Sequence, residues 1–380
     1  MHTSSAIFAL LLPLIFGCAA VPGPFGGAPS RAERVTSRAF GSTKDGLPAT
    51  LYTLRNASGV TALLTDFGAT LVSMRVPDRS GRLGDVVLGF DSVEGYESAD
   101  NQFFGCTAGR VANRVADARF ELDGEDYTLA PNNAPHSLHG GERGFGQRLW
   151  TAEIGSGAQV TFRYTSEAGE EGYPGTLRVR LTYTLTDADE LVLDYSAETD
   201  VPTLCNLTHH SYFNLTGHGA PSILEHELII NGSAITPTDE TLIPDGSFLE
   251  VDGTPFDFRE AHPIGERVAE LIPTGALGYD HNFVLEPEAG GGQEVAAELH
   301  DPSTGRTLEI RTDQPGLQFY SGNFLAGQKG KAGLSYVQRS ACCLETQAFP
   351  AAPSHDHFPS IVLRPGESYT HRTSHRFFVR

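Results

Sequence analysis

The chain has 380 residues, of which 39% are hydrophobic and 9% aromatic, enough to bury a sizeable core in one large or two ordinary domains. Its formal net charge of −20 repels phosphate backbones and anionic lipids, which argues against a nucleic-acid partner and favours a neutral substrate. Glycine (42) and proline (23) are plentiful and long helical heptads are absent, which is typical of a large all-β protein.

The N-terminal residues predict an export signal. An apolar run from Ala6 to Phe16 is too short to span a bilayer, and a Pro/Gly/Ala-rich segment follows it. We therefore expect a signal peptide over residues 1–20, a linker over 21–33 and a folded domain over 34–380. The protein would be exported to the periplasm or the extracellular space. Gly17-Cys18 also resembles a bacterial lipoprotein cleavage site, so a lipid anchor at Cys18 is the alternative, without a membrane span.

The remaining cysteines show no CxxC motif and no zinc-like spacing. We interpret them as small buried side chains rather than as a disulfide framework, although export would permit disulfides and the sequence leaves both open. They are Cys106, Cys205, Cys342 and Cys343.

Short strands are predicted along the whole chain after the linker. Residues 51–54 and 60–76 alternate in hydrophobicity, with a break near 66–68, and residues 119–129 predict a hairpin around Asp123-Gly124. Residues 150–197 alternate clearly and predict an antiparallel meander with one wet face. Further strands are expected at 308–312, 317–320 and 369–376.

The run from Leu204 to Gly217 carries the strongest signal for a functional site. In a strand, one face would present neutral polar groups around one imidazole, and the other face would be mostly apolar. Such a row suits a ligand made of hydroxyls, and imidazole titrates near pH ~6.5. A buried polar strand whose groups satisfy each other is the alternative. The predicted polar row consists of Asn206, Thr208, His210, Tyr212 and Asn214, with His209 on the apolar face.

Other candidate groups lie in loops and at strand starts. The loop at 103–114 holds two arginines and Asn113, and the loop at 132–141 holds His136 and His139 as competing candidates. A carboxylate precedes one strand at Asp280, and another lies among small and apolar residues at Glu345. A buried carboxylate and an imidazole suit acid–base chemistry near pH 7.

These motifs, taken in order, resemble the aldose 1-epimerase family, also called galactose mutarotases. The resemblance runs from about residue 35 to the C-terminus and becomes highly specific because all the motifs occur in family order. They are Gly109–Arg114, Ser137–Gly141, Asn206–Asn214, Asp280–Phe283, Gln314–Tyr320, Leu344–Gln347 and Leu363–Tyr369.

The resemblance implies an antiparallel β-supersandwich with few short helices, whose catalytic domain covers residues 34–380. It implies interconversion of the α and β anomers of free hexoses such as galactose and glucose. Glu345 matches the general base, His210 the general acid, and His139 a histidine that hydrogen-bonds near the ring oxygen. The matching sugar ligands are Asn113, Arg114, Asp280 and Gln314, whereas Arg110 is expected to be structural. No metal or organic cofactor is implied, and a monomer or weak dimer is expected.

Three other functions fit parts of the sequence. A hexose-6-phosphate 1-epimerase would need several cations around the phosphate, and Arg114 alone lies near a site motif. A non-catalytic carbohydrate-binding protein on the same fold would be expected to lack Glu345 or His210. A glycoside hydrolase would use Asp280 and Glu345 as its carboxylate pair.

Overall fold

The computed structural model describes residues 1–2, 34–286 and 294–380. Apart from Met1 and His2, the predicted signal peptide and linker lie outside the described residues, as does Cys18. Within the described part of the chain, no helix is long and apolar enough to cross a membrane.

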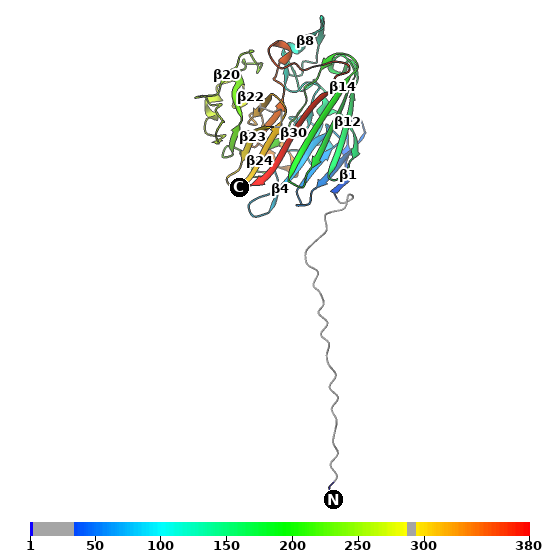
Figure 1. Ribbon diagram of the computed structural model, residues 1–380, viewed down its shortest axis with the longest axis vertical. Coiled ribbons are helices and arrows are strands. Elements are labelled where there is room, and N and C mark those ends of the chain that lie inside the picture. The colour runs from blue at the N-terminus through cyan, green and yellow to red at the C-terminus, as the bar shows by residue number, and fades with distance from the viewer. Residues whose placement is uncertain (3–33, 287–293) are drawn as a thin grey trace.

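The predicted all-β class is confirmed, and a nine-stranded antiparallel sheet is its largest element. Figure 1 shows the C-terminal strand β30 running through this sheet between β14 and β24. In spatial order the strands are β11 (Thr151–Ile154), β12 (Gln159–Ser166), β13 (Leu177–Leu185), β14 (Glu190–Thr199), β30 (Tyr369–Val379), β24 (Arg306–Thr312), β23 (Glu294–His300), β18 (Glu227–Ile230) and β21 (His262–Pro263).

Two further sheets are formed by strands from different parts of the chain. The five-stranded sheet is N-terminal and follows sequence order: β1 (Val35–Ser42), β2 (Pro48–Arg55), β3 (Thr61–Thr65), β4 (Thr70–Pro77) and β5 (Leu83–Asp85). The six-stranded sheet has the order β17 (Tyr212–Phe213), β28 (Cys342–Gln347), β25 (Gly316–Tyr320), β22 (Asp280–Leu285), β19 (Gly232–Thr236) and β20 (Leu249–Glu250).

Short pairs and turns of helix connect these sheets. The paired strands are β6 (Thr107–Ala108) with β16 (Thr208–His209), β7 (Arg114–Val115) with β10 (Ser137–Leu138), β8 (Arg119–Leu122) with β9 (Glu125–Thr128), β15 (Thr203–Leu204) with β29 (Val362–Leu363), and β26 (Gln328–Lys329) with β27 (Ser335–Tyr336). The helices are α2 (Val93–Tyr96) and the 3-10 turns η1 (Ala116–Ala118), η2 (Phe145–Gln147), η3 (Glu170–Gly172), η4 (Val268–Leu271), η5 (Lys331–Gly333) and η6 (Ala352–Ser354).

One continuous core joins the three large sheets. It combines side chains of the nine-stranded sheet, such as Leu193 and Ile310, with Leu64 of β3 and with Phe319 and Leu344 of the six-stranded sheet. Because side chains alternate along a strand, residues between these core positions face the other side of the six-stranded sheet. The alternation predicted for residues 150–197 is confirmed by β11 to β14, which pair in sequence as a meander.

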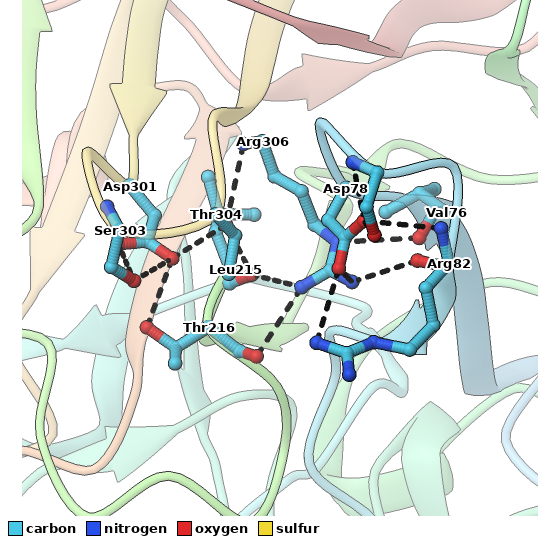
Figure 2. Close-up of polar contacts among 10 residues, drawn as sticks. Val76, Asp78, Arg82, Leu215, Thr216, Asp301, Ser303, Thr304 and Arg306 are labelled. Atoms are coloured by element: carbon cyan, nitrogen blue, oxygen red, sulfur yellow. Dashed lines mark hydrogen bonds and ion pairs between the residues drawn. The ribbon is translucent and has the colours of Figure 1, made fainter.

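A buried arginine ties three distant segments together (Figure 2). The Arg306 guanidinium donates to the carbonyl oxygens of Val76 and Arg82 in the β4–β5 hairpin. It also donates to the carbonyl oxygen of Leu215 at 2.8 Å, just beyond β17. This network fixes the end of the site-bearing segment to both the N-terminal sheet and the β23–β24 hairpin. Replacing the side chain would remove these hydrogen bonds, each contributing about 1.5–3 kcal/mol as a bond to a charged group.

The four described cysteines are buried and free, as predicted. Cys205 and Cys342 belong to the main core, and Cys343 lies on the opposite face of β28. Burial raises the pKa of the Cys106 and Cys342 thiols to about 12, so both stay protonated at neutral pH.

Candidate active site

The outward face of the six-stranded sheet forms one wall of a buried pocket. On β28, Cys342 and Leu344 point into the main core, so Glu345 points to the other face. On β22, Phe283 belongs to the core, and Asp280 shares the outward face with Glu345. The same alternation that builds the core therefore brings two carboxylates to the pocket.

The pocket has a volume of about 160 Å³ and combines acidic, basic and aromatic side chains. Six of the seven predicted site residues line it. Its lining consists of Gln102, Phe103, Asn113, Arg114, Leu138, His139, His210, Tyr212, Asp280, Tyr320, Phe324 and Glu345.

His210 and Glu345 form the closest acid–base pair of the pocket. Nε2 of His210 lies 3.7 Å from Oε1 of Glu345, and both side chains are almost completely buried. Nδ1 of the same imidazole lies 3.5 Å from Sγ of Cys343. The imidazole also stacks on the rings of Phe103 and Tyr212, which fix its plane. One imidazole nitrogen is thus directed at the carboxylate, with room for a substrate atom beside the pair.

Burial shifts the proton affinities of these two groups in opposite directions. Loss of solvent raises the pKa of Glu345 well above its usual value; the nearby Asp280 raises it further, while Arg114 lowers it. Loss of solvent lowers the pKa of His210 to about 4. Strongly shifted titratable groups in a concave site are typical of catalysis.

His139 is held in one tautomer by the loop that precedes β7. Its Nδ1 accepts a hydrogen bond from the backbone N–H of Asn113 at 3.2 Å. The ring proton of the neutral imidazole must therefore sit on Nε2, and burial keeps the pKa of His139 well below its usual value. The two histidine rings lie 4.9 Å apart, nearly perpendicular to each other. The Nε2–H group of neutral His139 is thus left to donate, close to His210.

His136, the competing candidate, lies outside this pocket. Its Nδ1 accepts from the backbone N–H of Asp117 at 3.0 Å, and its Nε2 lies 2.9 Å from the Thr241 hydroxyl. Arg110 is likewise absent from the pocket lining. Its buried guanidinium donates to Ser166 and to the carbonyl oxygen of Pro174, as expected of a structural arginine.

Arg114 and Asp280 provide the opposite charges of the pocket. The Arg114 guanidinium contacts Oδ1 of Asn133 at 3.2 Å and Oδ1 of Asn113 at 3.5 Å. Oδ1 of Asp280 accepts a hydrogen bond of 2.7 Å from Nε2 of Gln318. Burial raises the pKa of Asp280, against the opposing effects of Arg114 and Gln318.

The structure does not bring Gln314, the seventh predicted residue, to the lining of this pocket. Gln314 lies in the turn before β25, and its side chain donates to Oδ1 of Asp313 at 2.9 Å. Gln318 instead lies beside the site: the register of β25 pairs it with Glu345, and its amide donates to Asp280. The alternation of the sequence indicates that the Gln318 side chain points away from the core, since Gln318 stands between the core residues Leu317 and Phe319.

Comparisons with known proteins agree on one family. The family model described as aldose 1-epimerase matches residues 50–376. A galactose mutarotase from Bos taurus is 48% identical over 319 residues, which cover 83% of this chain and 90% of the relative. An aldose 1-epimerase from Escherichia coli is 39% identical over 338 residues, which cover 88% of this chain and 97% of the relative. The chain belongs to the aldose 1-epimerase family.

A solved structure supports the same assignment. A GalM/aldose epimerase homologue from C. elegans superposes with a TM-score of 0.78 at 34% identity, covering 85% of this chain and 96% of that one. The predicted fold is therefore confirmed, and the protein is an isomerase.

The segment Leu204–Gly217 of this epimerase divides into two roles. Only His210 and Tyr212 of the predicted polar row line the pocket. Asn206, Thr208 and Asn214 instead bind backbone groups of other segments, for example Nδ2 of Asn214 with the carbonyl oxygen of Ser340 at 2.8 Å. The alternative of a self-satisfied polar strand thus describes three of the five residues. His209 faces the core, as predicted, where it contacts Tyr183 and Ser211.

The aromatic residues of the epimerase pocket were not all foreseen. Phe103, Tyr320 and Phe324 line it beside the predicted Tyr212. Phe103 adopts a left-handed backbone conformation with φ of 59°, and so does His139 with φ of 49°. Bulky residues occupy this region at a cost of about 1–3 kcal/mol, and they cluster at functional sites.

His139, His210 and Glu345 also have the spacing of a metal site. One potential ligand atom from each lies within 4.8 Å of the others. Two imidazoles and a carboxylate are the ligands of many catalytic zinc sites, so the same cluster fits either a cation or an acid–base substrate. Because Nδ1 of His139 is engaged by Asn113, only its Nε2 is available to either.

Proposed function

We propose that this protein interconverts the α and β anomers of free hexoses such as galactose and glucose. The observation that carries the proposal is the 3.7 Å approach of His210 Nε2 to Glu345 Oε1 inside a pocket lined by polar and aromatic groups. The sugar's C1 hydroxyl and ring oxygen are bonded to the same carbon. A base and an acid this close are spaced to serve both oxygens at once.

In the proposed reaction, the enzyme takes one proton from the sugar and gives one proton to it. The ionised carboxylate of Glu345 takes the proton from the C1 hydroxyl, and protonated His210 gives its proton to the ring oxygen. The C1–O5 bond breaks, the electron pair of the former O–H bond forms the aldehyde, and the open chain rotates about C1–C2. Closure on the other face of C1 reverses both transfers, so the enzyme returns to its starting state.

Other residues of the pocket hold the sugar in this proposal. His139 donates from Nε2 to the region of the ring oxygen, because its Nδ1 is already occupied. Asn113, Arg114 and Asp280 bind sugar hydroxyls, and Gln318 orients Asp280 through its 2.7 Å hydrogen bond. No resident metal is required for these steps.

The pocket lining argues against the phosphorylated alternative. A sugar phosphate calls for several convergent cations. Among the described lining residues, Arg114 is the sole lysine or arginine. A purely sugar-binding role is disfavoured because both acid–base groups are present and adjacent.

Polarimetry of freshly dissolved α-D-glucose and α-D-galactose tests the proposal. Wild-type protein should speed the drift to anomeric equilibrium, with activity unchanged after treatment with EDTA. Glu345→Gln and His210→Ala should each lower kcat by about 10²–10⁴-fold, the effect of a lost acid–base group. Wild-type protein no faster than buffer would refute the proposal for these sugars, and loss of activity on chelation would assign the cluster to a metal.

We also propose that the enzyme is exported, and that it acts as a monomer or weak dimer. The apolar run at residues 6–16 and the Pro/Gly/Ala-rich segment after it support export. Expression in a bacterial host should give a processed chain outside the cytoplasm, and the intact mass should show cleavage near Ala20 or before a lipidated Cys18. An unprocessed chain confined to the cytosol would refute export. Light scattering checks the oligomeric state.

A further inference from the structure

A row of buried amides continues the pocket wall beyond Glu345. The strand registers place Asn282 opposite Gln318, and Gln318 opposite Glu345. Gln347 follows Glu345 by two residues on β28 and therefore lies on the same face. All four side chains are at most 3% exposed.

These side chains carry polar atoms with no hydrogen-bond partner among the described groups. The atoms are Asn282 Oδ1, Gln318 Oε1, Glu345 Oε2 and both amide atoms of Gln347. A buried polar atom left unpaired costs about 1–3 kcal/mol, so several on adjacent positions of one sheet need a shared explanation. Both the amide nitrogen of Gln347, a donor, and its amide oxygen, an acceptor, lack a partner. Exchanging the positions of the two atoms would therefore leave both unpaired.

Gly316, which has no side chain, leaves space between β22 and β28 on this face of the sheet. Gly316 pairs with Gln347 on one side and with Val284 on the other. A Cβ atom at Gly316 would lie 2.4 Å from Oδ1 of Asn282. The Asn282 amide therefore leans over the glycine toward β28, into space that any other residue would fill.

We propose that Asn282 and Gln347 hold a small cluster of water molecules that hydrogen-bonds to Oε2 of Glu345 and positions this carboxylate. A water molecule both donates and accepts, and buried waters make about two to four hydrogen bonds to groups of this kind. The inference rests on the proposed role of Glu345 as base. To act, Glu345 must become ionised against burial and the nearby Asp280, so a donor on its second oxygen favours the active form.

Gln347→Met and Asn282→Leu test this role in the full chain. Each removes an amide while keeping a similar volume. We expect kcat to fall about tenfold in polarimetry, KM to stay within about twofold, and the alkaline limb of the pH profile to move to higher pH. Gln159→Met is the matched control, because Gln159 lies on β12 of the nine-stranded sheet, outside the pocket lining, and should leave both parameters unchanged.

Stability and structure provide readouts that do not depend on activity. If the amides were merely unpaired, Gln347→Met would raise the melting temperature, because an apolar group would replace an unsatisfied one. A hydrated cluster predicts a lower melting temperature. A high-resolution crystal structure of the wild type should show water within hydrogen-bond distance of both Gln347 and Glu345 Oε2.

A dry site in that crystal structure, or an unchanged kcat and pH profile in both amide variants, would overturn the inference. If Gln347→Met fails to fold, Asn282→Leu and the wild-type crystal structure decide. A wild type without mutarotase activity would instead refute the proposed function, so the two failures are distinguishable.

Discussion

At the residue scale, Glu345 and His210 behave as a pair that shares one proton. Burial opposes charge on both, raising the pKa of the carboxyl and lowering that of the imidazole to about 4. Over a wide pH range the free enzyme therefore keeps one proton on the pair. Moving that proton between the partners converts a neutral pair into carboxylate and imidazolium, the form proposed to open the sugar ring. The substrate provides the path, because its two oxygens would accept and release the proton.

This shared proton predicts a bell-shaped pH dependence of kcat/KM. Below about pH 4 both groups are protonated and no base remains, so activity falls on the acid side. At alkaline pH the pair loses its last proton and no acid remains. Between these limits kcat/KM should be nearly constant. Polarimetric rates from pH 3.5 to 10 check this, with the apparent values assigned to the pair rather than to either residue. An acid limb near ~6.5, the value of a solvated histidine, would contradict the buried pair.

At the element scale, strand alternation explains what could be predicted from the sequence. Gln318 and Glu345 lie on the outward face of the six-stranded sheet because their neighbours Leu317, Phe319 and Leu344 face the core. Such a pattern predicts on which face of a sheet a side chain lies, but not which strand pairs with its own. The segment 204–217 shows the difference: β15 pairs with β29, β16 with β6 and β17 with β28, so the predicted continuous strand is broken into three short pieces.

Long-range pairing also separates the site residues that were predicted from those that were missed. His210 and Asp280 stand in polar motifs, and Glu345 is a carboxylate among small and apolar residues, so the sequence displays all three directly. Gln318 comes into contact with Asp280 only when β25 takes its place between β22 and β28. Phe324 follows β25 in a loop, and its aromatic ring carries no local signal that distinguishes a pocket wall from an ordinary exposed side chain.

At the scale of the whole molecule, the interior contains an unusual number of neutral imidazoles. Along β30, His371, Thr373 and His375 point inward together with Phe377, so a strand with polar alternation is buried on one face. His371 lies 2.8 Å from the Thr373 hydroxyl and 3.1 Å from the carbonyl oxygen of Leu207. Hydrophobic periodicity does not identify such a face as core, because its inward residues are not apolar.

These buried histidines predict that acid destabilises the protein well before its carboxylates titrate. Loss of solvent is the largest cause lowering the pKa of each, to about 4 for His226, His281 and His371 and to about 3 for His375. In the unfolded chain the same groups titrate near ~6.5. Their contribution to stability is therefore complete above pH ~6.5, and it is lost as pH falls toward 4, because the unfolded state then binds more protons. Each additional proton taken up on unfolding lowers the free energy of unfolding by about 1.4 kcal/mol per pH unit.

Urea denaturation at pH 8, 7, 6 and 5 measures this effect. The free energy of unfolding should fall steeply from pH 6 to 5. Between pH 8 and 7 the histidines are neutral in both states, so it should not fall there. The carboxyls whose pKa is raised act in the opposite direction, since they favour the folded state at low pH, but they are fewer than the histidines; they are Asp66, Asp280 and Glu345. His375→Phe should reduce the slope, because it removes one buried imidazole that contacts the rings of His209 and Phe213. Phe377→Leu is the control, because it removes apolar volume from the same strand without removing a titratable group, so the slope should stay unchanged. A free energy of unfolding that stays constant down to pH 5 would show that the interior tolerates imidazolium, contrary to the contacts around β30.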